Sequence, residues 1–217
     1  MYDSADQLKF EILLRNEIVK AAKELNNSGM SFEIFRESKC NPKFWIRTNE
    51  GGFKLKEGVR SSDAIADIFT NGSLYGTECA TAMIIVYYKA LLNIFPKEAF
   101  DRLFPKIHLM NWHYIDRLLK STGSMRKEKD YLPGDRRYFA NPDVNPTTPE
   151  WQGENAIDLN SVLYYGHGVG IFNSETIIKL LNENRIENPK RSAYLMEGAG
   201  RPDFKEFYGI YRNLMGL

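Results

Sequence analysis

Apolar residues recur with a helical period at the beginning of the chain and form a continuous run near its centre. Between Leu8 and Leu25 the apolar positions fall near helical spacing, and the polar segment 26–29 then ends the pattern. The longest apolar run, Cys79 to Tyr88, follows a turn-prone segment, which predicts a loop leading into a buried helix. This helix must end before Pro96, because proline does not continue a helix. We therefore expect an amphipathic helix and a central buried helix.

Shorter apolar stretches between glycine, proline and asparagine predict the other elements. In the first half we expect strands at 32–35, 44–48 and 53–55, and short helices at 63–69, with Ser62 as its cap, and at 97–104. In the second half we expect extended segments at 107–112, 138–139, 155–159 and 162–172, a polar loop at 121–130 and a helix from Asn173 to Leu181. Helices followed by a run of strands are typical of the α+β class, and no linker divides the chain. One domain over residues 1–217 is expected, while the segment after Ser192 shows no clear pattern.

Composition and charge describe an ordinary globular protein. Hydrophobic residues make up 43% and charged residues 26% of the chain, which argues against a disordered class. The 29 basic and 28 acidic side chains leave a net charge of +1, so charge indicates neither nucleic acid nor a membrane as a partner. Residues 1–25 lack the apolar core of a signal peptide, and the run 79–88 is too short to span a bilayer. We expect a soluble protein with two free cysteines, made in a reducing compartment.

Cys79 is the most informative position for chemistry. It lies in the first turn of the predicted buried helix, with Thr77 as the expected cap. Its small neighbours Ala80 and Ala82 leave room for a substrate, and the positive end of the helix dipole favours thiolate. A buried cysteine acting as a small hydrophobe is the alternative. Cys40 lies outside every motif, so we expect it to be structural.

A cysteine nucleophile needs a base, and two candidates follow it in the sequence. In hydrolases of the papain type the base is a histidine on a strand after the nucleophile helix, and His167 fits this order. Its flanking glycines allow close approach of a substrate, the alternative being a turn histidine without a role. Glu154, behind Trp151 at the beginning of a predicted strand, competes for the role, the alternative being a solvated glutamate. Glu78 would oppose a thiolate when ionised and could share its proton when neutral.

Metal and cofactor chemistry is not expected. His108 and His113 are five positions apart, a spacing that matches no common ligand pair, and no cysteine or carboxylate cluster completes a site. The glycine-rich segment 166–170 lacks the lysine of a phosphate loop. Aromatic residues are most often core residues, but Trp112 and Trp151 each lie in the approach to a polar candidate segment.

The segment 132–139 resembles the Pro-Gly-Asp turn and following strand of papain-like bacterial cell-wall peptidases. In those enzymes a histidine opens the next strand, and here Glu154 stands in the equivalent place. His167 stands at the third polar position, on the strand after it. The glutamate in the histidine position argues against simple hydrolysis.

Four separated motifs, at 75–82, 111–114, 151–155 and 165–171, closely resemble one family. It comprises the spore-coat protein-glutamine gamma-glutamyltransferases of endospore-forming bacteria, which are small, calcium-independent transglutaminases. The similarity extends from about Phe10 to Leu181. It implies a papain-like single domain, with the nucleophile at the N-terminus of a buried helix that packs on an antiparallel sheet.

The resemblance also implies roles for individual residues. The nucleophile falls on Cys79 and the catalytic carboxylate on Glu154, with Glu78 as a supporting carboxylate and His167 expected to orient or hydrogen-bond this group. The residues expected to line a water-poor substrate site are Trp112, Trp151 and Tyr138. The implied partners are spore-coat proteins that carry glutamine and lysine side chains. The implied location is the mother-cell cytoplasm at synthesis and the spore coat after assembly, with no cofactor.

Proton transfer constrains this mechanism. A model thiol with a pKa of about 8.5 and a model glutamate with one of about 4.3 differ by about 4 units, which costs roughly 5 to 6 kcal/mol. We expect burial of Glu154, the helix terminus at Cys79 and a proton shared with Glu78 to reduce this cost. Two alternatives stay open: a papain-like amidase or peptidase acting on cell-wall peptides with His167 as base, and a non-catalytic coat protein.

Overall fold

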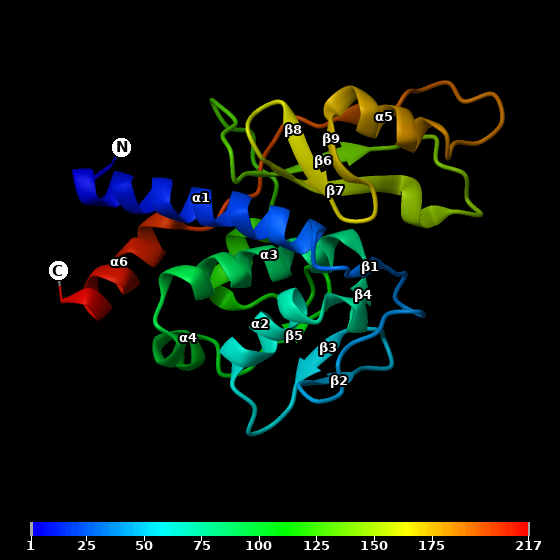
Figure 1. Ribbon diagram of the computed structural model, residues 1–217. Helices are drawn as coiled ribbons and strands as arrows, with labels where there is room; N and C mark the ends of the chain where they lie inside the picture. Colours follow the sequence, from blue (N-terminus) through cyan, green and yellow to red (C-terminus); the bar gives the residue numbers. More distant parts are fainter. Residues whose placement is uncertain (1, 217) are drawn as a thin grey trace.

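A buried helix, α3 (Cys79–Ile94), lies at the centre of the computed structural model, which describes residues 2–216 (Figure 1). Its buried residues run continuously from Ala80 to Tyr88, as the apolar run predicts. The amphipathic α1 (Ala5–Asn26) packs along it, and α2 (Ser61–Thr70) and α4 (Lys97–Leu103) also contact it. The sequence therefore placed both principal helices correctly.

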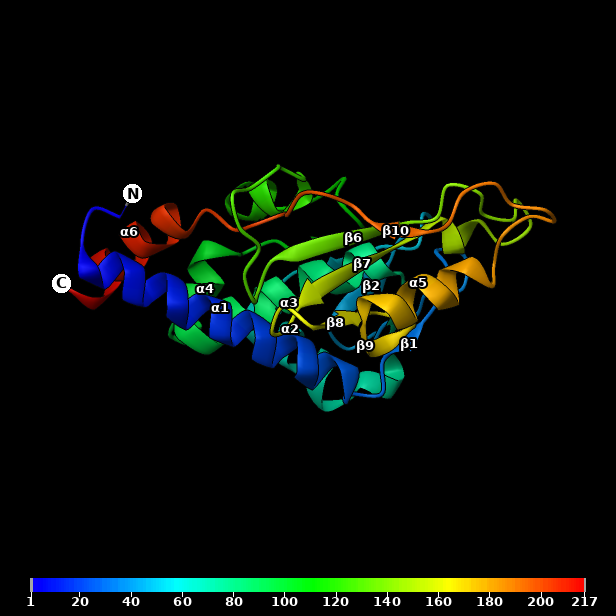
Figure 2. The ribbon, with the colours of Figure 1, turned by 90° about the horizontal axis from the view of Figure 1, so that it is seen from above.

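A five-stranded antiparallel sheet lies over α3 (Figure 2). Its strands, in spatial order, are β10 (Tyr194–Leu195), β6 (Arg136–Ala140), β7 (Gly153–Asp158), β8 (Leu163–Gly166) and β9 (Gly170–Asn173). β7 is buried along its whole length. Helix α3 contacts it, and a hydrophobic cluster that includes side chains of α5 (Ser174–Asn182) covers its other face. This arrangement confirms the predicted α+β class, with a buried helix packed on an antiparallel sheet.

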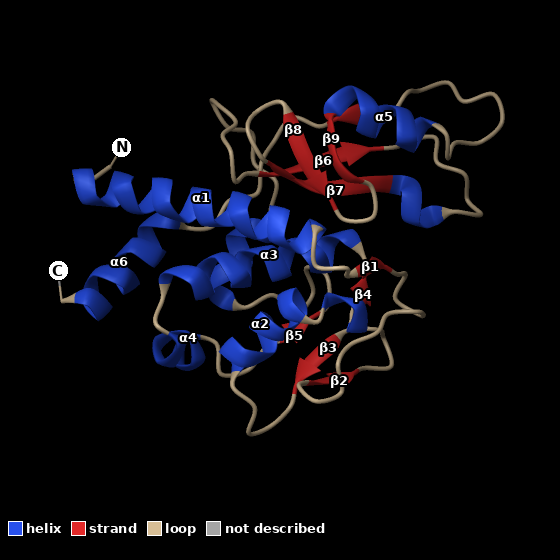
Figure 3. Ribbon diagram, viewed as in Figure 1, coloured by secondary structure: helices blue, strands red, loops and turns tan. Residues whose placement is uncertain are grey.

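The remaining elements lie around α3 and the five-stranded sheet (Figure 3). They are the strands β1 (Ser31–Phe32), β2 (Trp45–Arg47), β3 (Phe53–Leu55), β4 (Gly76–Thr77) and β5 (His108–Leu109), the 3₁₀ helices η1 (Gly72–Leu74), η2 (Arg117–Gly123) and η3 (Pro149–Gln152), and the helix α6 (Phe204–Met215). β2, β3 and β5 form a second sheet, and β1 pairs with β4 in parallel just before α3. Among residues 2–216, no helix combines the length and the apolar character that crossing a membrane requires.

The segment 162–172 is two strands and a turn rather than one extended element. Gly168 and Gly170 have φ values of +106° and +97°, a backbone region that favours glycine, and the chain reverses between β8 and β9. His167 therefore lies in the turn and not on a strand. The strands expected at 32–35 and 107–112 are also shorter, with two residues each, and the unassigned tail contributes β10 and α6.

Two predicted helix caps are wrong. Thr77 belongs to β4, and Glu78 is the residue that caps α3. Ser62 lies inside α2, where its backbone N–H and hydroxyl both donate to Asp101 of α4. In both places a carboxylate accepts from the free N–H groups of the first turn, a role that helix ends leave open to any nearby acceptor.

The Pro-Gly-Asp turn forms as the sequence predicts, and it joins β6 to α1. Gly134 has a φ of +87°, and a Cβ there would lie 3.2 Å from the backbone of Arg15. Asp135 is fully buried and accepts from Arg15 Nη1 at 2.8 Å and Arg201 Nε at 2.7 Å. These charge-assisted bonds fix the beginning of β6 relative to α1, and the next residues along β6 enter the site.

Candidate active site

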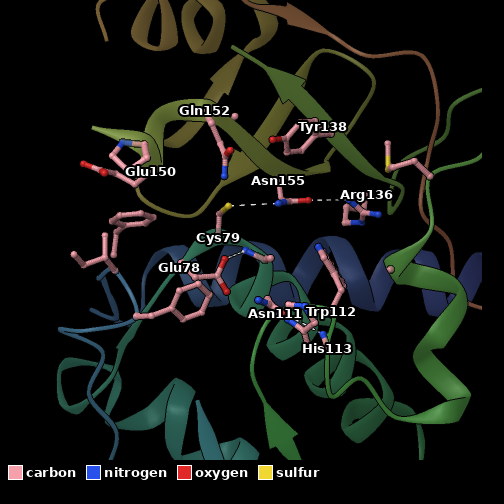
Figure 4. Close-up of a pocket in the computed structure, with 18 of the residues that line it drawn as sticks. Glu78, Cys79, Asn111, Trp112, His113, Arg136, Tyr138, Glu150, Gln152 and Asn155 are labelled. Carbon is pink, nitrogen blue, oxygen red and sulfur yellow. Dashed lines mark hydrogen bonds between the residues drawn. The ribbon is translucent and has the colours of Figure 1, made fainter. Parts of the chain in front are cut away.

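A cleft of about 950 Å³ opens between the beginning of α3 and strands β6 and β7 (Figure 4). Its residues include Glu78, Cys79, Asn111, Trp112, Arg136, Tyr138 and Asn155. Helix α3 supplies the thiol, the 111–113 turn supplies one wall, and the sheet supplies the opposite wall. The sequence-predicted residues Cys79, Glu78, Trp112 and Tyr138 are thus brought together.

Glu78 shapes the electrostatics at the beginning of α3. Its Oε2 accepts from the N–H of Ala80 at 2.6 Å, and its Oε1 accepts from the N–H and the hydroxyl of Thr81. Burial raises the pKa of Glu78, and these hydrogen bonds oppose the rise. As the capping residue of α3, Glu78 therefore holds a carboxylate next to Cys79 in the chain, where its charge acts on the thiol.

The pKa of Cys79 is raised well above its ordinary value, first by burial and then by the charges of Glu154 and Glu78. The expectation that the helix terminus favours thiolate is therefore wrong for the resting site. The partial positive charge at a helix end is only about half a unit, and here two carboxylates and desolvation act against it. Cys79 rests as a thiol.

We expect limiting iodoacetamide to modify Cys79 before Cys40, at a rate that still rises above about pH 8.5. Burial raises the pKa of both thiols, that of Cys40 to about 11, so the expected difference comes from access: Cys79 opens on the cleft, whereas Cys40 packs against the core. Only the thiolate reacts, so a raised pKa moves the increase in rate to higher pH. Mass mapping after brief treatment across the range from about pH 7 to about pH 10 measures both. Preferential labelling of Cys40, or a rate plateau below about pH 8, would contradict the expectation.

Glu154 lies at the beginning of β7 beside a small cavity that it shares with Phe32, Trp151 and His167. Its side chain is buried, and Oε1 has no hydrogen-bond partner among residues 2–216. Burial and then the charge of Glu78 raise the pKa of Glu154 well above its ordinary value, which confirms the predicted direction. A hydrogen bond from the backbone N–H of His167 acts to lower the pKa of Glu154.

The alternation of β7 separates Glu154 from Asn155. Neighbouring residues of a strand point to opposite faces, and Asn155 is the one that reaches the thiol, with Nδ2 at 3.4 Å from Cys79 Sγ. Of the hydrogen bonds in the described part of the chain, none joins Glu154 to Cys79. The carboxylate and the thiol are linked by charge alone in this resting state.

His167 is buried, and both nitrogens of its ring are engaged. Nε2 donates to the carbonyl of Ser31 at 3.1 Å, so Nδ1 is the acceptor for the Tyr165 hydroxyl, also at 3.1 Å. Burial lowers the pKa of His167 to about 4, so the ring is neutral at physiological pH. The imidazole ties β1 to β8, and this arrangement disfavours a role as general base.

The three aromatic candidates divide between the two cavities. Trp112 and Tyr138 line the cleft with Cys79, whereas Trp151 lies at the small cavity of Glu154. Asn155 and Arg136 were not among the sequence-predicted site residues. Strand alternation could have revealed Asn155, because it predicts that only one of two adjacent polar residues faces the helix.

The fold and the site define an α+β domain in which a cysteine at the N-terminus of a buried helix faces polar side chains of an antiparallel sheet. The family model described as protein-glutamine gamma-glutamyltransferase matches residues 1–211. A protein of that name from Bacillus mycoides is 51% identical over 202 residues, which cover 93% of this chain and 72% of the relative. One from Bacillus cereus is 49% identical over 204 residues, with the same two coverages.

A solved structure agrees with these relatives. The transglutaminase from Geobacillus stearothermophilus, without its C-terminal extension, matches with a TM-score of 0.89 and 46% identity, over 95% of this chain and 98% of that one. The chain belongs to the protein-glutamine gamma-glutamyltransferase family, and it is a transglutaminase, an acyltransferase. The family resemblance seen in the sequence motifs is thereby confirmed.

Proposed function

We propose that Cys79 is the nucleophile that cross-links proteins through glutamine and lysine side chains, within one transglutaminase domain over residues 1–217. The observation that carries this proposal is a thiol that opens on a cleft and whose pKa responds to two carboxylates, Glu78 and Glu154, whose own pKa values burial raises. Cys79 Sγ attacks the glutamine carboxamide carbon, and the carbon–nitrogen bond breaks to leave a thioester and ammonia. The lysine amine then attacks the thioester, which forms the isopeptide bond and frees the thiol.

Glu154 is the proton carrier in this scheme. It accepts the thiol proton as sulfur attacks and delivers it to the leaving nitrogen, which departs as ammonia. In the second half it accepts a proton from the attacking amine and returns one to sulfur. Glu154 lies close enough to Cys79 for its charge to raise the pKa of the thiol, and its Oε1 accepts no hydrogen bond among residues 2–216, whereas both oxygens of Glu78 accept bonds within α3.

Glu78 supports the transfer through its charge. A like charge nearby disfavours the ionised form of Glu154 and so strengthens it as a base. The raised pKa of Glu154 acts against the gap of about 4 units between model thiol and carboxylate pKa values, while the raised pKa of Cys79 acts in the opposite direction. Trp112, Trp151 and Tyr138 bind substrate and exclude water, which protects the thioester from hydrolysis. His167 positions Glu154 through its main chain, while its ring holds the turn against β1.

The protein substrates that we propose are spore-coat proteins, and the cross-linking requires no calcium. We further propose synthesis in the mother-cell cytoplasm and assembly onto the coat. The support is the resemblance of the motifs at 75–82, 111–114, 151–155 and 165–171 to the spore-coat family.

The test is incorporation of a labelled primary amine into a glutamine-bearing protein in the presence of EDTA. We expect about one ammonia released for each amine incorporated, and no increase on addition of calcium, because no step uses a metal. Ammonia and free acid without amine incorporation would indicate the amidase alternative. Neither product would indicate a non-catalytic coat protein.

A further inference from the structure

Asn155 is the only side chain of the sheet that hydrogen-bonds the Cys79 sulfur among the described residues. Its amide has two ends, and the structure fixes which end faces the thiol. Oδ1 accepts from Arg136 Nη1 at 2.8 Å in a buried bond, so Nδ2 is turned towards the sulfur (Figure 4). Arg136 has no acceptor capacity, so a flipped amide would set an N–H group against another N–H group.

Arg136 is itself held on three sides. Arg136 lies two residues before Tyr138 on β6, and Tyr138 pairs with Asn155 on β7. The side chains of Arg136 and Asn155 therefore lie on the same face of the sheet, the face that is turned towards α3. Arg136 Nε donates to the carbonyl of Thr122 at 2.9 Å, and its guanidinium lies 4.4 Å from the centroid of the Trp112 ring. Only 3% of Arg136 is exposed.

The charge of Arg136 is not neutralised by a carboxylate. No salt bridge of Arg136 occurs within residues 2–216, and its Nη2 is buried without a hydrogen-bond partner although the residue lines the cleft. An unpaired buried cation is costly, and it persists where surrounding structure holds it in place. Here it lies next to the amide that contacts the thiol, where a positive charge stabilises a thiolate.

We propose that Asn155 is a catalytic residue that donates its amide N–H to the Cys79 sulfur, and that Arg136 is the positioning residue that fixes this amide. The bond holds the sulfur in one orientation and strengthens as negative charge develops on it, because hydrogen bonds to ions are stronger than neutral ones. This inference rests on the proposed role of Cys79 as nucleophile. It assigns to Arg136 no contact with the substrate.

The molecule offers a matched control in Arg137, the next residue on β6. It is 5% exposed, donates to the carbonyls of Gly198 and Met196, and lies 3.8 Å from the centroid of the Tyr131 ring. Arg136→Met and Arg137→Met therefore remove the same charge, the same kind of backbone hydrogen bond and the same aromatic contact. Only Arg136→Met removes the hydrogen bond that orients the Asn155 amide.

The experiment measures kcat and KM for amine incorporation, and the pH dependence of Cys79 alkylation, in Asn155→Ala, Arg136→Met, their double variant and Arg137→Met. We expect Asn155→Ala and Arg136→Met each to lower kcat about 10- to 100-fold with KM changed less than about threefold. The double variant should be no more than about threefold worse than Asn155→Ala, because Arg136 acts through Asn155. The alkylation profile should move to higher pH in these variants and stay in place in Arg137→Met.

If Asn155→Ala does not fold, because it truncates a buried side chain, Asn155→Asp is the variant that tests the inference. Aspartate retains the acceptor for Arg136 but has no N–H for the sulfur, so a folded but weakly active Asn155→Asp is expected. Near wild-type kcat in folded Asn155→Ala or Asn155→Asp, multiplicative losses in the double variant, or an equal loss in Arg137→Met would overturn the inference. Full activity of Cys79→Ala would instead overturn the proposed function, so the two failures are distinguishable.

Discussion

Cys79→Ala is expected to abolish amine incorporation, with kcat/KM lowered by at least about 10⁴-fold. Alanine cannot form the thioester, and the remaining groups of the cleft can only bind the glutamine side chain. Cys79→Ser should be nearly as inactive, because a hydroxyl is far harder to deprotonate beside two carboxylates. Steady-state incorporation of a labelled amine, with the limit of detection stated, measures the loss.

Cys40→Ala is the control for this result. Cys40 is half-buried and packs against the core outside the cleft, so its truncation should lower thermal stability slightly and leave kcat/KM within about twofold. Activity retained in Cys79→Ala but lost in Cys40→Ala would exchange the roles of the two thiols. Activity retained in both variants would exclude a cysteine nucleophile.

The sequence correctly predicted the elements that depend on neighbouring residues alone. The apolar run from Cys79 to Tyr88 produced a buried helix, and the Pro-Gly-Asp turn before β6 formed as expected. The caps were missed because capping depends on which acceptor reaches the first-turn N–H groups, and Asp101 reaches Ser62 from another helix. The hairpin at 162–172 was missed because the glycines beside His167 were interpreted as allowing close approach of a substrate, whereas Gly168 and Gly170 lie where the chain reverses.

The thiol shows why site electrostatics could not be predicted from position alone. A helix terminus is a local feature, and by itself it favours thiolate at Cys79. Burial, and a carboxylate brought in from β7 some 75 residues later, reverse the direction of the shift. Asn155 was missed because strand alternation predicts that one of Glu154 and Asn155 faces α3 but does not say which of the two it is.

Glu154→Gln is expected to lower kcat/KM by about 10²- to 10⁴-fold, the range of general acid–base contributions. The amide keeps the size of the side chain but cannot carry the proton between sulfur, amine and ammonia. The double variant with Glu78→Gln should be worse than either single variant. Glu150→Gln is the control, because Glu150 lines both cavities but is exposed, and its kcat/KM should stay within about threefold.

The pH profile separates the two carboxylates. Glu154 acts as a base when ionised, so activity falls as the pH drops through its pKa. Glu78→Gln removes a like charge that raises the pKa of Glu154, so the acidic limb of kcat/KM should move to lower pH. An acidic limb that stays in place, or moves upward, would remove Glu78 from this electrostatic role.

His167→Ala completes the comparison of roles. The ring is neutral and bound to Tyr165 and Ser31, so its loss should loosen the turn behind Glu154 and reduce kcat/KM less than Glu154→Gln does. The three variants Cys79→Ala, Glu154→Gln and His167→Ala are measured on one glutamine substrate, with folding checked by thermal unfolding. If His167→Ala is as inactive as Cys79→Ala while Glu154→Gln stays active, the histidine carries the proton and the site operates as a cysteine–histidine pair. The imidazole of His167 is buried and both of its nitrogens are hydrogen-bonded. We therefore expect the larger loss of activity in Glu154→Gln, with Glu154 as the base.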